Sequence, residues 1–492
     1  MFEQNGDTAE AADGQVQDDD VSDPTARICE ELLKLNQLRV YKWRWFVLGV
    51  VCLINCSNAM LWISFAPVAD LTASFFSIPL DIVNLFSLVY LVISIPVGFG
   101  ASWLLDTLGL KSSILLSSWL NMIGSVIRCL SIITFLNTGG VGAIYIFVGQ
   151  CICAIAQPLI LFVPAKLAAV WFPDHQRATA NMIASMSNPL GILLANVLSP
   201  TVVKVAKDVP KIIGLYSLPA VLACTLATFG VCDKAPPSPP SASARKSTSE
   251  PFCSGVWQLL NNKAYCILML CFGAGIGIFT AFSAFLEQIL CFNGYSNFFS
   301  GLCGALFIFF GIIGALLCGL YVDKTKRFTE VVKICFSMAS LASIAFAVVS
   351  NFRNQSGLLA IICSIFGFFG FSVYPIAMEL AVECSYPIGE GTSTGLAFIS
   401  GQFQGLVYMV IFQKISIPFA VSSLSSCGVN QIEIYNWSYS TLVLAGLCSF
   451  FSCIFVIFFH TDYKRLNAEM NPTPTEEETQ QIGSEETQIP VM

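Results

Sequence analysis

The sequence predicts an all-α membrane protein whose twelve transmembrane helices form two six-helix halves. Of its 492 residues, 55% are hydrophobic and only 11% are charged, whereas a soluble domain carries about 25% charged residues. Apolar runs of the length that crosses a bilayer, about 20 residues, occur six times on each side of a Pro/Ser-rich break. This composition argues against a soluble enzyme, a nucleic-acid-binding protein and a secreted disulfide scaffold.

The predicted helices follow one another along the chain. In the N-terminal half, 44–233, they are expected at 44–66, 82–105, 113–135, 142–165, 178–202 and 211–232. In the C-terminal half, 263–460, they are expected at 264–290, 298–322, 329–350, 357–383, 392–413 and 437–460. The break, 234–262, contains a run of prolines and serines that favours neither a helix nor a packed core. We expect it to be a flexible cytoplasmic linker.

The net charge of −7 belongs to the two ends of the chain. Residues 1–42 hold 10 acids and 4 bases, and residues 461–492 hold 7 acids and 2 bases. We therefore expect an acidic N-terminal tail, 1–43, and an acidic C-terminal tail, 461–492, both solvated and outside the membrane.

Lysine and arginine gather on one side of the predicted helices. With the N-terminus in the cytoplasm, 18 of the 24 bases lie on the inner side and 5 on the outer side, as the positive-inside rule favours. Both termini are thus predicted to be cytoplasmic, in a multi-pass protein that we assign to the plasma membrane by default. The glycosylation sequons at Asn354 and Asn436 then fall on the outer side.

Similar motifs follow the second and the eighth predicted helix. Their aspartates are 217 residues apart, and Pro173 and Pro387, after the fourth and tenth helices, are 214 apart. These offsets indicate a duplicated six-helix unit, as in transporters whose halves rock about a central site. A carboxylate between two bases beside helix ends can hold an inner gate closed, although ordinary positive-inside loop chemistry is the alternative. The motif residues are Asp106, Gly109, Lys111, Asp323, Lys324 and Arg327.

Few ionisable residues lie inside the predicted helices, where each is a candidate for function. Glu379 and Glu383 are one helical turn apart near the inner end of the tenth helix. We expect them to pair with inner-loop bases such as Lys324 or Arg327 as gate elements, with interfacial solvation as the alternative. Arg128, in the third helix, is expected to bond a carbonyl or an acid within the bundle.

Glu287 lies near the outer end of the seventh helix. It is either a counter-ion for a cationic solute, a proton carrier, or a group that reaches the outer water. Trp62 on the first helix lies deeper than is usual for a residue of the interfacial aromatic belt. Its indole face would suit an alkylammonium, with packing or anchoring in the belt as the alternative. Gln157 and Gln402, near helix centres in the two halves, either face a shared cavity or bond neighbouring helices.

Enzyme chemistry has no support in the sequence. The two histidines, His175 and His460, lie at helix ends, and no phosphate-binding loop, Ser-His-Asp set or metal-ligand cluster is present. We therefore expect no enzyme, no cofactor and no metal.

The loop motifs resemble the signature Gly-x-x-x-Asp-Arg/Lys-x-Gly-x-Arg/Lys of the major facilitator superfamily. Ser102 replaces the first glycine in one copy, and the other copy lacks the second glycine. Longer runs resemble the feline leukaemia virus subgroup C receptor-related family, solute carrier family 49, over roughly residues 43–460. The runs are Asn58-Ala-Met-Leu-Trp62-Ile, Ser102-Trp-Leu-Leu-Asp-Thr-Leu-Gly-Leu, Gly149-Gln-Cys-Ile-Cys-Ala-Ile-Ala-Gln157, Ala169-Val-Trp-Phe172 and Glu379-Leu-Ala-Val-Glu-Cys-Ser-Tyr-Pro-Ile-Gly-Glu-Gly-Thr-Ser393.

This resemblance implies the major facilitator fold and transport of a small organic solute. Relatives are associated with choline and ethanolamine, historically with haem and, more distantly, with pyridoxine. Their cavity residues match Trp62, Gln157 and Gln402 here, whereas Thr280 stands where a tyrosine is expected. The relatives have an Asn-Gln pair further along this helix, and this chain has Glu287-Gln288. Compared with the relatives, the expected cavity therefore lacks one aromatic residue and gains an acid.

The leading hypothesis is thus an alternating-access transporter of a small amine or organic cation, monomeric and without nucleic-acid partners. Trp62 and Thr280 would flank the solute and Gln157 and Gln402 would orient it. A haem or porphyrin exporter and a non-transporting membrane sensor or receptor are the alternatives.

Overall fold

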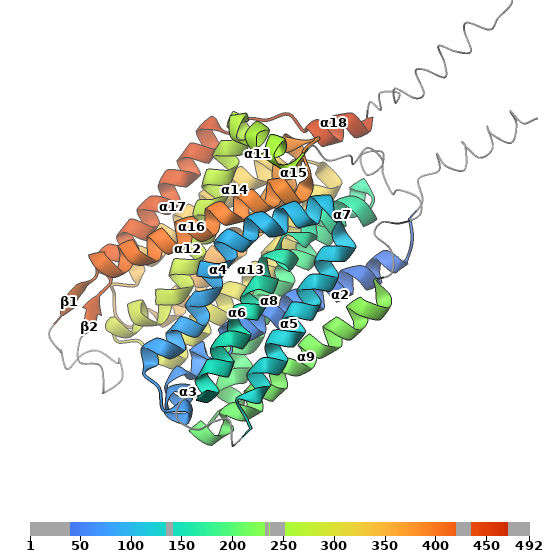
Figure 1. The fold of residues 1–492 in the computed structure, drawn as a ribbon. Coiled ribbons are helices and arrows are strands. Elements are labelled where there is room, and N and C mark those ends of the chain that lie inside the picture. Colours follow the sequence, from blue (N-terminus) through green and yellow to red (C-terminus); the bar gives the residue numbers. More distant parts are fainter. Residues whose placement is uncertain (1–39, 134–140, 232–235, 237–250, 420–433, 471–492) are drawn as a thin grey trace, which may run out of the picture.

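Twelve helices long and apolar enough to cross a membrane make up the bundle seen in the computed structural model (Figure 1). The structure describes residues 40–133, 141–231, 236, 251–419 and 434–470. Each predicted run lies on one of these helices, with boundaries that differ by a few residues. The prediction of twelve membrane helices is confirmed.

The N-terminal half consists of six spanning helices and short connecting elements. Its elements are α2 (Trp43–Ile63), η1 (Ala66–Val68), α3 (Ala69–Phe76), α4 (Leu80–Thr107), α5 (Leu110–Leu130), α6 (Val141–Leu161), α7 (Val163–Trp171), η2 (Asp174–Gln176), α8 (Arg177–Val202), η3 (Ala206–Asp208) and α9 (Val209–Gly230).

The C-terminal half repeats this plan. Its elements are α11 (Phe252–Asn261), α12 (Lys263–Phe292), α13 (Asn297–Thr325), α14 (Phe328–Val349), α15 (Ser356–Ser385), α16 (Glu390–Ile415), β1 (Ile417–Phe419), β2 (Ile434–Asn436), α17 (Ser438–Phe458) and α18 (Lys464–Met470). The strands β1 and β2 form one antiparallel pair beside the bundle, an addition to the all-α expectation.

Small residues let neighbouring helices approach closely, which is the usual basis of helix association in membranes. A Cβ added at Gly124 of α5 would lie 2.7 Å from the carbonyl oxygen of Gly149 on α6. Gly367 of α15 lies against the backbone of Phe307 on α13, with no space for a side chain. Both contacts lie within one half of the molecule, so they hold each half together as a unit.

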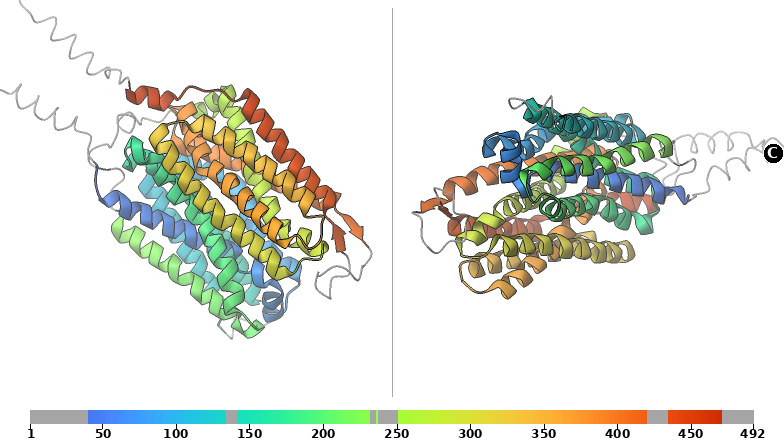
Figure 2. Two further views of the ribbon diagram at one scale, coloured as in Figure 1. Left: turned by 180° about the vertical axis from the view of Figure 1, so that it is seen from behind. Right: turned by 90° about the horizontal axis from the view of Figure 1, so that it is seen from below.

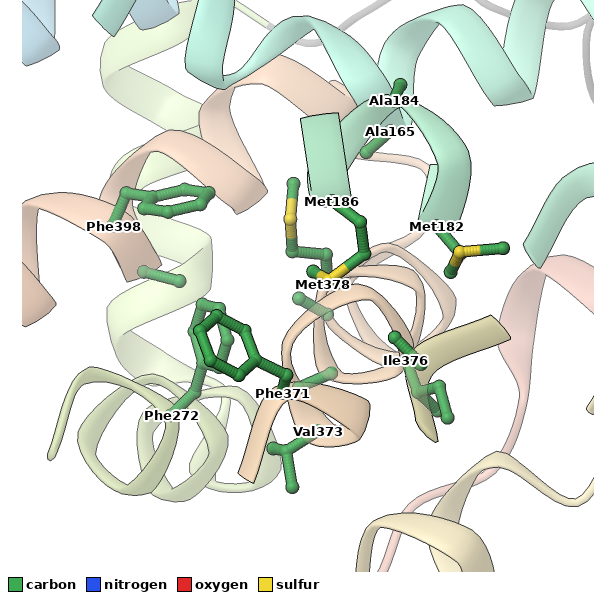
Figure 3. Packing of buried hydrophobic residues seen from close by; sticks show 14 of the residues in the cluster. Ala165, Met182, Ala184, Met186, Phe272, Phe371, Val373, Ile376, Met378 and Phe398 are labelled. Atoms are coloured by element: carbon green, nitrogen blue, oxygen red, sulfur yellow. The ribbon is translucent and has the colours of Figure 1, made fainter. Parts of the chain in front are cut away.

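The two halves meet where α4 packs on α16 and where α8 packs on α13. Large apolar side chains from both halves fill the interface, such as Met186 of α8 beside Met378 of α15 (Figure 3). We call the end of the bundle where α4 and α13 end and α8 and α16 begin the gate end; β1, β2 and α3 lie at the opposite, far end (Figures 1 and 2).

Two predicted extramembrane segments contain more structure than expected. Part of the linker 234–262 is the helix α11, which packs against α12 and α16. Part of the C-terminal tail is the helix α18, which packs against α15 and carries the buried side chain of Arg465. Residues 1–39 and 471–492 of the tails, and residues 234–235 and 237–250 of the linker, lie outside the described part of the chain.

Candidate functional site

A cavity of about 160 Å³ lies between the two halves. Four of the predicted solute-site residues line it: Trp62 on α2, Gln157 on α6, Thr280 on α12 and Gln402 on α16. Two come from each half, so the cavity lies at the interface between the halves. Glu287 belongs to α12, but its side chain lies outside the described residues, and its role stays a prediction.

Aromatic rings form much of the cavity wall. Phe272, Tyr374 and Phe398 make one cluster with ring centroids 5.5 to 6.0 Å apart; Figure 3 shows Phe272 and Phe398. From the N-terminal half, the rings of Trp62 and Tyr90 also line the cavity and lie 6.3 Å apart. Such rings offer their faces to an organic cation or to an apolar group.

Neutral polar groups complete the wall. Besides Gln157, Thr280 and Gln402, the cavity is lined by Asn188, and Asp, Glu, Lys, Arg and His are absent from the lining residues that the structure describes. The Thr280 hydroxyl donates to the Ile276 carbonyl at 2.9 Å, so its free lone pair remains as an acceptor. The described part of the wall therefore offers ring faces and neutral polar groups to a solute.

Sequence reasoning missed part of this wall. Tyr90 and Tyr374 line the cavity, yet in the sequence each is one aromatic residue among many in an apolar helix. Their inward direction depends on how the helices pack, which helical periodicity alone does not define when a helix is apolar on all sides. The only available signal was the phenolic hydroxyl of tyrosine, which usually needs a hydrogen-bond partner when the residue is buried.

Asp106 joins the two halves at the gate end. Its carboxylate accepts hydrogen bonds from the Gly391 N–H at 2.9 Å, the Thr392 N–H at 2.5 Å and the Thr392 hydroxyl at 2.6 Å. Lys166 of α7 bridges this carboxylate, at 3.2 Å, to Glu390 at 2.9 Å. The first N–H groups of a helix lack partners within that helix, so an acid from the N-terminal half caps α16 of the C-terminal half.

Asp323 makes the matching contact from the other half. Its carboxylate accepts from the Ala178 N–H at 2.9 Å, from the Thr179 N–H at 2.7 Å and from the Thr179 hydroxyl. It therefore caps α8 as Asp106 caps α16. The two aspartates of the duplicated motif occupy equivalent places, and their main partners are backbone N–H groups at helix starts rather than loop bases.

The other motif residues lie around these contacts. Gly109 has a φ of +87° at the start of α5, a conformation that glycine adopts without strain. Lys324 is exposed, and Arg327 forms an exposed ion pair with Glu330 at 3.3 Å. Lys111 is half-buried at the first turn of α5.

The expected pairing of Glu379 and Glu383 with Lys324 or Arg327 is wrong. Both glutamates are buried on α15 and pair with Arg465 of α18, which lies 2.8 Å from Glu383 and also contacts Glu379. The backbone N–H of Leu466 donates to Glu383 at 3.0 Å. Arg465, which follows the last spanning helix, satisfies both carboxylates. The alternative expectation, that water at the membrane interface solvates them, is therefore wrong as well.

Arg128 bonds to a backbone carbonyl of α2, as expected for a base inside the bundle. Arg128 donates to the Leu61 carbonyl at 3.1 Å, which confirms the expectation of a carbonyl partner.

The two sequon asparagines lie at the far end. Asn354, in a loop with a φ of +59°, is exposed, and Asn436 at the end of β2 is half-buried. The Asn436 side chain accepts from the Ser438 N–H at 2.9 Å.

Comparison with known proteins agrees with this architecture. The family model of the Major Facilitator Superfamily matches residues 50–409. The chain is 68% identical to solute carrier family 49 member A3 of Xenopus tropicalis, over 90% of this chain and 92% of the relative. It is 28% identical to the choline/ethanolamine transporter flvcr2b of Danio rerio, over 84% of this chain and 87% of the relative.

The fold is also found among solved structures. The proton:xylose symporter XylE bound to 6-bromo-6-deoxy-D-glucose superposes with a TM-score of 0.66, 12% identity, and coverage of 87% of this chain and 98% of that chain. At this identity the likeness concerns the fold alone. The chain belongs to the major facilitator superfamily of membrane transporters and, within it, to solute carrier family 49.

Proposed function

We propose that this transporter carries a small amine or organic cation of the choline/ethanolamine type by alternating access. The observation that carries the proposal is the composition of the cavity wall, where ring faces and two glutamine side chains from opposite halves meet. A cation with its charge spread over alkyl groups is well matched to ring faces. The choline/ethanolamine transporter of Danio rerio is a relative over most of the chain.

In this proposal Trp62 and Thr280 flank the solute and Gln157 and Gln402 orient it. Asp106, Asp323 and Lys166 hold the gate end closed, and the gate end faces the cytoplasm of a plasma-membrane protein. The protein acts as a monomer, because one chain supplies both halves of the cavity and both caps of the gate.

Haem or another porphyrin fits the cavity poorly. The cavity of about 160 Å³ is smaller than the roughly 300–1,000 Å³ of sites for drug-sized ligands. Its described lining contains neither histidine as an iron ligand nor a base for the propionates. A small solute with few polar groups is the better match.

Uptake of a panel of labelled amines and organic cations into expressing cells tests the proposal. We expect at least one compound to accumulate, and accumulation to fall by about tenfold or more in Trp62→Ala and in Gln402→Ala, since each loses a direct contact worth about 1–2 kcal/mol. Trp103→Ala is the matched control, because that tryptophan is 45% exposed on the outer surface of α4. A flux that both cavity variants leave unchanged contradicts the proposed site.

A further inference from the structure

The helix α2 ends inside the span to which it belongs. The apolar span runs from Trp43 to Val68, whereas α2 stops at Ile63 and η1 begins only at Ala66. Trp62, which lines the cavity, is the second-last residue of α2. The last carbonyl groups of a helix have no partner within it, and in a membrane each must be satisfied by a neighbour.

Side chains from three neighbouring helices converge on this helix end. Arg128 of α5 donates to the Leu61 carbonyl at 3.1 Å and to the Ser64 hydroxyl at 2.5 Å. Gln150 of α6 donates to the same Leu61 carbonyl at 3.4 Å. Ser199 of α8 donates to the Ser64 carbonyl at 3.0 Å. The break in α2 is therefore held from outside, on both sides of Trp62.

The same side chains reach the second aromatic residue of this wall. The Gln150 amide donates to the Phe86 carbonyl at 3.3 Å, and its oxygen accepts from the Tyr90 hydroxyl at 3.5 Å. The Trp62 indole N–H donates to the Ser87 carbonyl at 3.0 Å. One buried network thus connects the end of α2 with the turn of α4 that carries Tyr90.

The charge of Arg128 suits this position. The side chain is 1% exposed, and within the described part of the chain it forms no ion pair with a carboxylate. Its guanidinium carbon lies 4.9 Å from the centre of the Phe65 ring. The C-terminal end of a helix is the negative end of its dipole, so the end of α2 and the ring face together stabilise a cation that has no acid beside it.

We propose that Arg128 and Gln150 are positioning residues of the solute site. They hold the interrupted end of α2 so that Trp62 faces Tyr90 and the cavity. Neither side chain lines the cavity, so each acts through the aromatic pair. The role of the pair in solute binding rests on the proposed function, whereas the fixing of the α2 end does not.

Hydrogen–deuterium exchange of residues 61–68, measured in lipid nanodiscs, tests the structural step without any solute. We expect Gln150→Ala and Arg128→Met to speed exchange of this segment by about tenfold or more, because each removes a donor from another helix that holds the end of α2. Gln150→Ala loses the bond to the Leu61 carbonyl, and Arg128→Met loses the bonds to that carbonyl and to the Ser64 hydroxyl. Arg128→Lys keeps the charge but cannot make both directed bonds, and it should fall between the wild type and Arg128→Met.

The control for this experiment is Ser340→Ala, which removes a 2.9 Å hydrogen bond to Ser449 between α14 and α17 in the other half. It should leave exchange of residues 61–68 unchanged. If Arg128→Met does not fold, Gln150→Ala decides alone. The proposal is wrong if residues 61–68 exchange at the wild-type rate in Gln150→Ala.

Choline, used as the probe in uptake, tests the link to the site. We expect Gln150→Ala to raise the KM for choline by about tenfold, as Trp62→Ala does, with the maximal rate per transporter at the cell surface little changed. A raised KM in Trp62→Ala with an unchanged KM in Gln150→Ala refutes the positioning role. If the wild type does not transport choline, the choice of solute is wrong, and the exchange experiment still decides whether the network fixes α2.

Discussion

Replacing Asp106 by asparagine is expected to open the gate end. The substitution keeps the size of the side chain, removes its charge and turns one acceptor oxygen into a donor. That donor then faces N–H groups of Gly391 and Thr392, which the carboxylate accepts from in the structure. The ion pair with Lys166 is lost as well. The hydrogen bonds to Gly391 and Thr392 join the two halves, so they exist only while the gate end is closed. Lys166 lies in the same half as Asp106 and reaches the other half through Glu390.

The magnitude follows from the contacts that are lost. Hydrogen bonds to a charged group contribute about 1.5–3 kcal/mol each, and asparagine can replace at most part of the three that Asp106 accepts from Gly391 and Thr392 of the other half. A loss of about 3 kcal/mol in the closed state corresponds to roughly a hundredfold shift of the equilibrium, at about 1.4 kcal/mol per factor of ten. A transporter that is mostly closed at this end would then be mostly open.

Spin-label distance measurements across the gate end detect this shift. Suitable positions are Phe229 at the end of α9 and Gln258 on α11, both exposed and in opposite halves. Because the chain has 20 cysteines, the labels are best introduced on unnatural amino acids. Asp208→Asn is the matched control, since that aspartate pairs with Lys211 at the far end.

We expect a longer distance between the two labels in Asp106→Asn and the wild-type distance in Asp208→Asn. A wild-type distance distribution in Asp106→Asn, with the protein folded, would show that the cap on α16 does not hold the gate. The same result in a variant that combines Asp106→Asn and Asp323→Asn would refute the role of both caps.

Two further predictions concern α18 and the far end. Arg465→Ala should lower the midpoint of thermal unfolding, because breaking a buried ion pair by removing one partner costs about 3–5 kcal/mol. Lys464→Ala is the control, since Lys464 is exposed on the same helix, and it should leave the midpoint unchanged. An equal midpoint in both variants would show that the Arg465 contacts do not stabilise the fold. Glycosidase treatment should shift the wild type on a gel and should shift Asn354→Gln less, since Asn354 is exposed at the far end; the absence of any shift in the wild type contradicts glycosylation at both sequons.

The twelve spans could be predicted from the sequence because a bilayer imposes one simple requirement, a continuous apolar run, on each helix. The duplicated Asp106 and Asp323 motifs could be recognised for a similar reason, since both sit at turns that interrupt apolar runs. Trp62, Gln157 and Gln402 were candidates from their depth in apolar helices and from the resemblance to a known family, whereas Thr280 came from the resemblance alone; all four line the cavity.

The ionic partners could not be predicted in the same way. In the sequence, Lys166 and Arg465 are two of 24 bases. Lys166 follows the end of a predicted helix, and Arg465 lies in the C-terminal tail, where acids outnumber bases. Their burial depends on where α7 and α18 pack, which no local pattern encodes. The sequence shows part of the interruption of α2, because Pro67 lacks the N–H that a continuing helix needs. It does not show that Arg128, Gln150 and Ser199 on other helices bond to the helix end.

Flux through the purified protein in proteoliposomes tests the central claim most directly. The solute that accumulates in expressing cells is supplied on one side, and its appearance on the other side is followed for the wild type, for Trp62→Ala with Gln402→Ala, and for Trp103→Ala. Transport by the wild type and Trp103→Ala, with loss in the cavity variant, is the predicted result. Binding of the solute without flux would indicate a sensor rather than a transporter, and flux that survives in the cavity variant would contradict the cavity as the solute site.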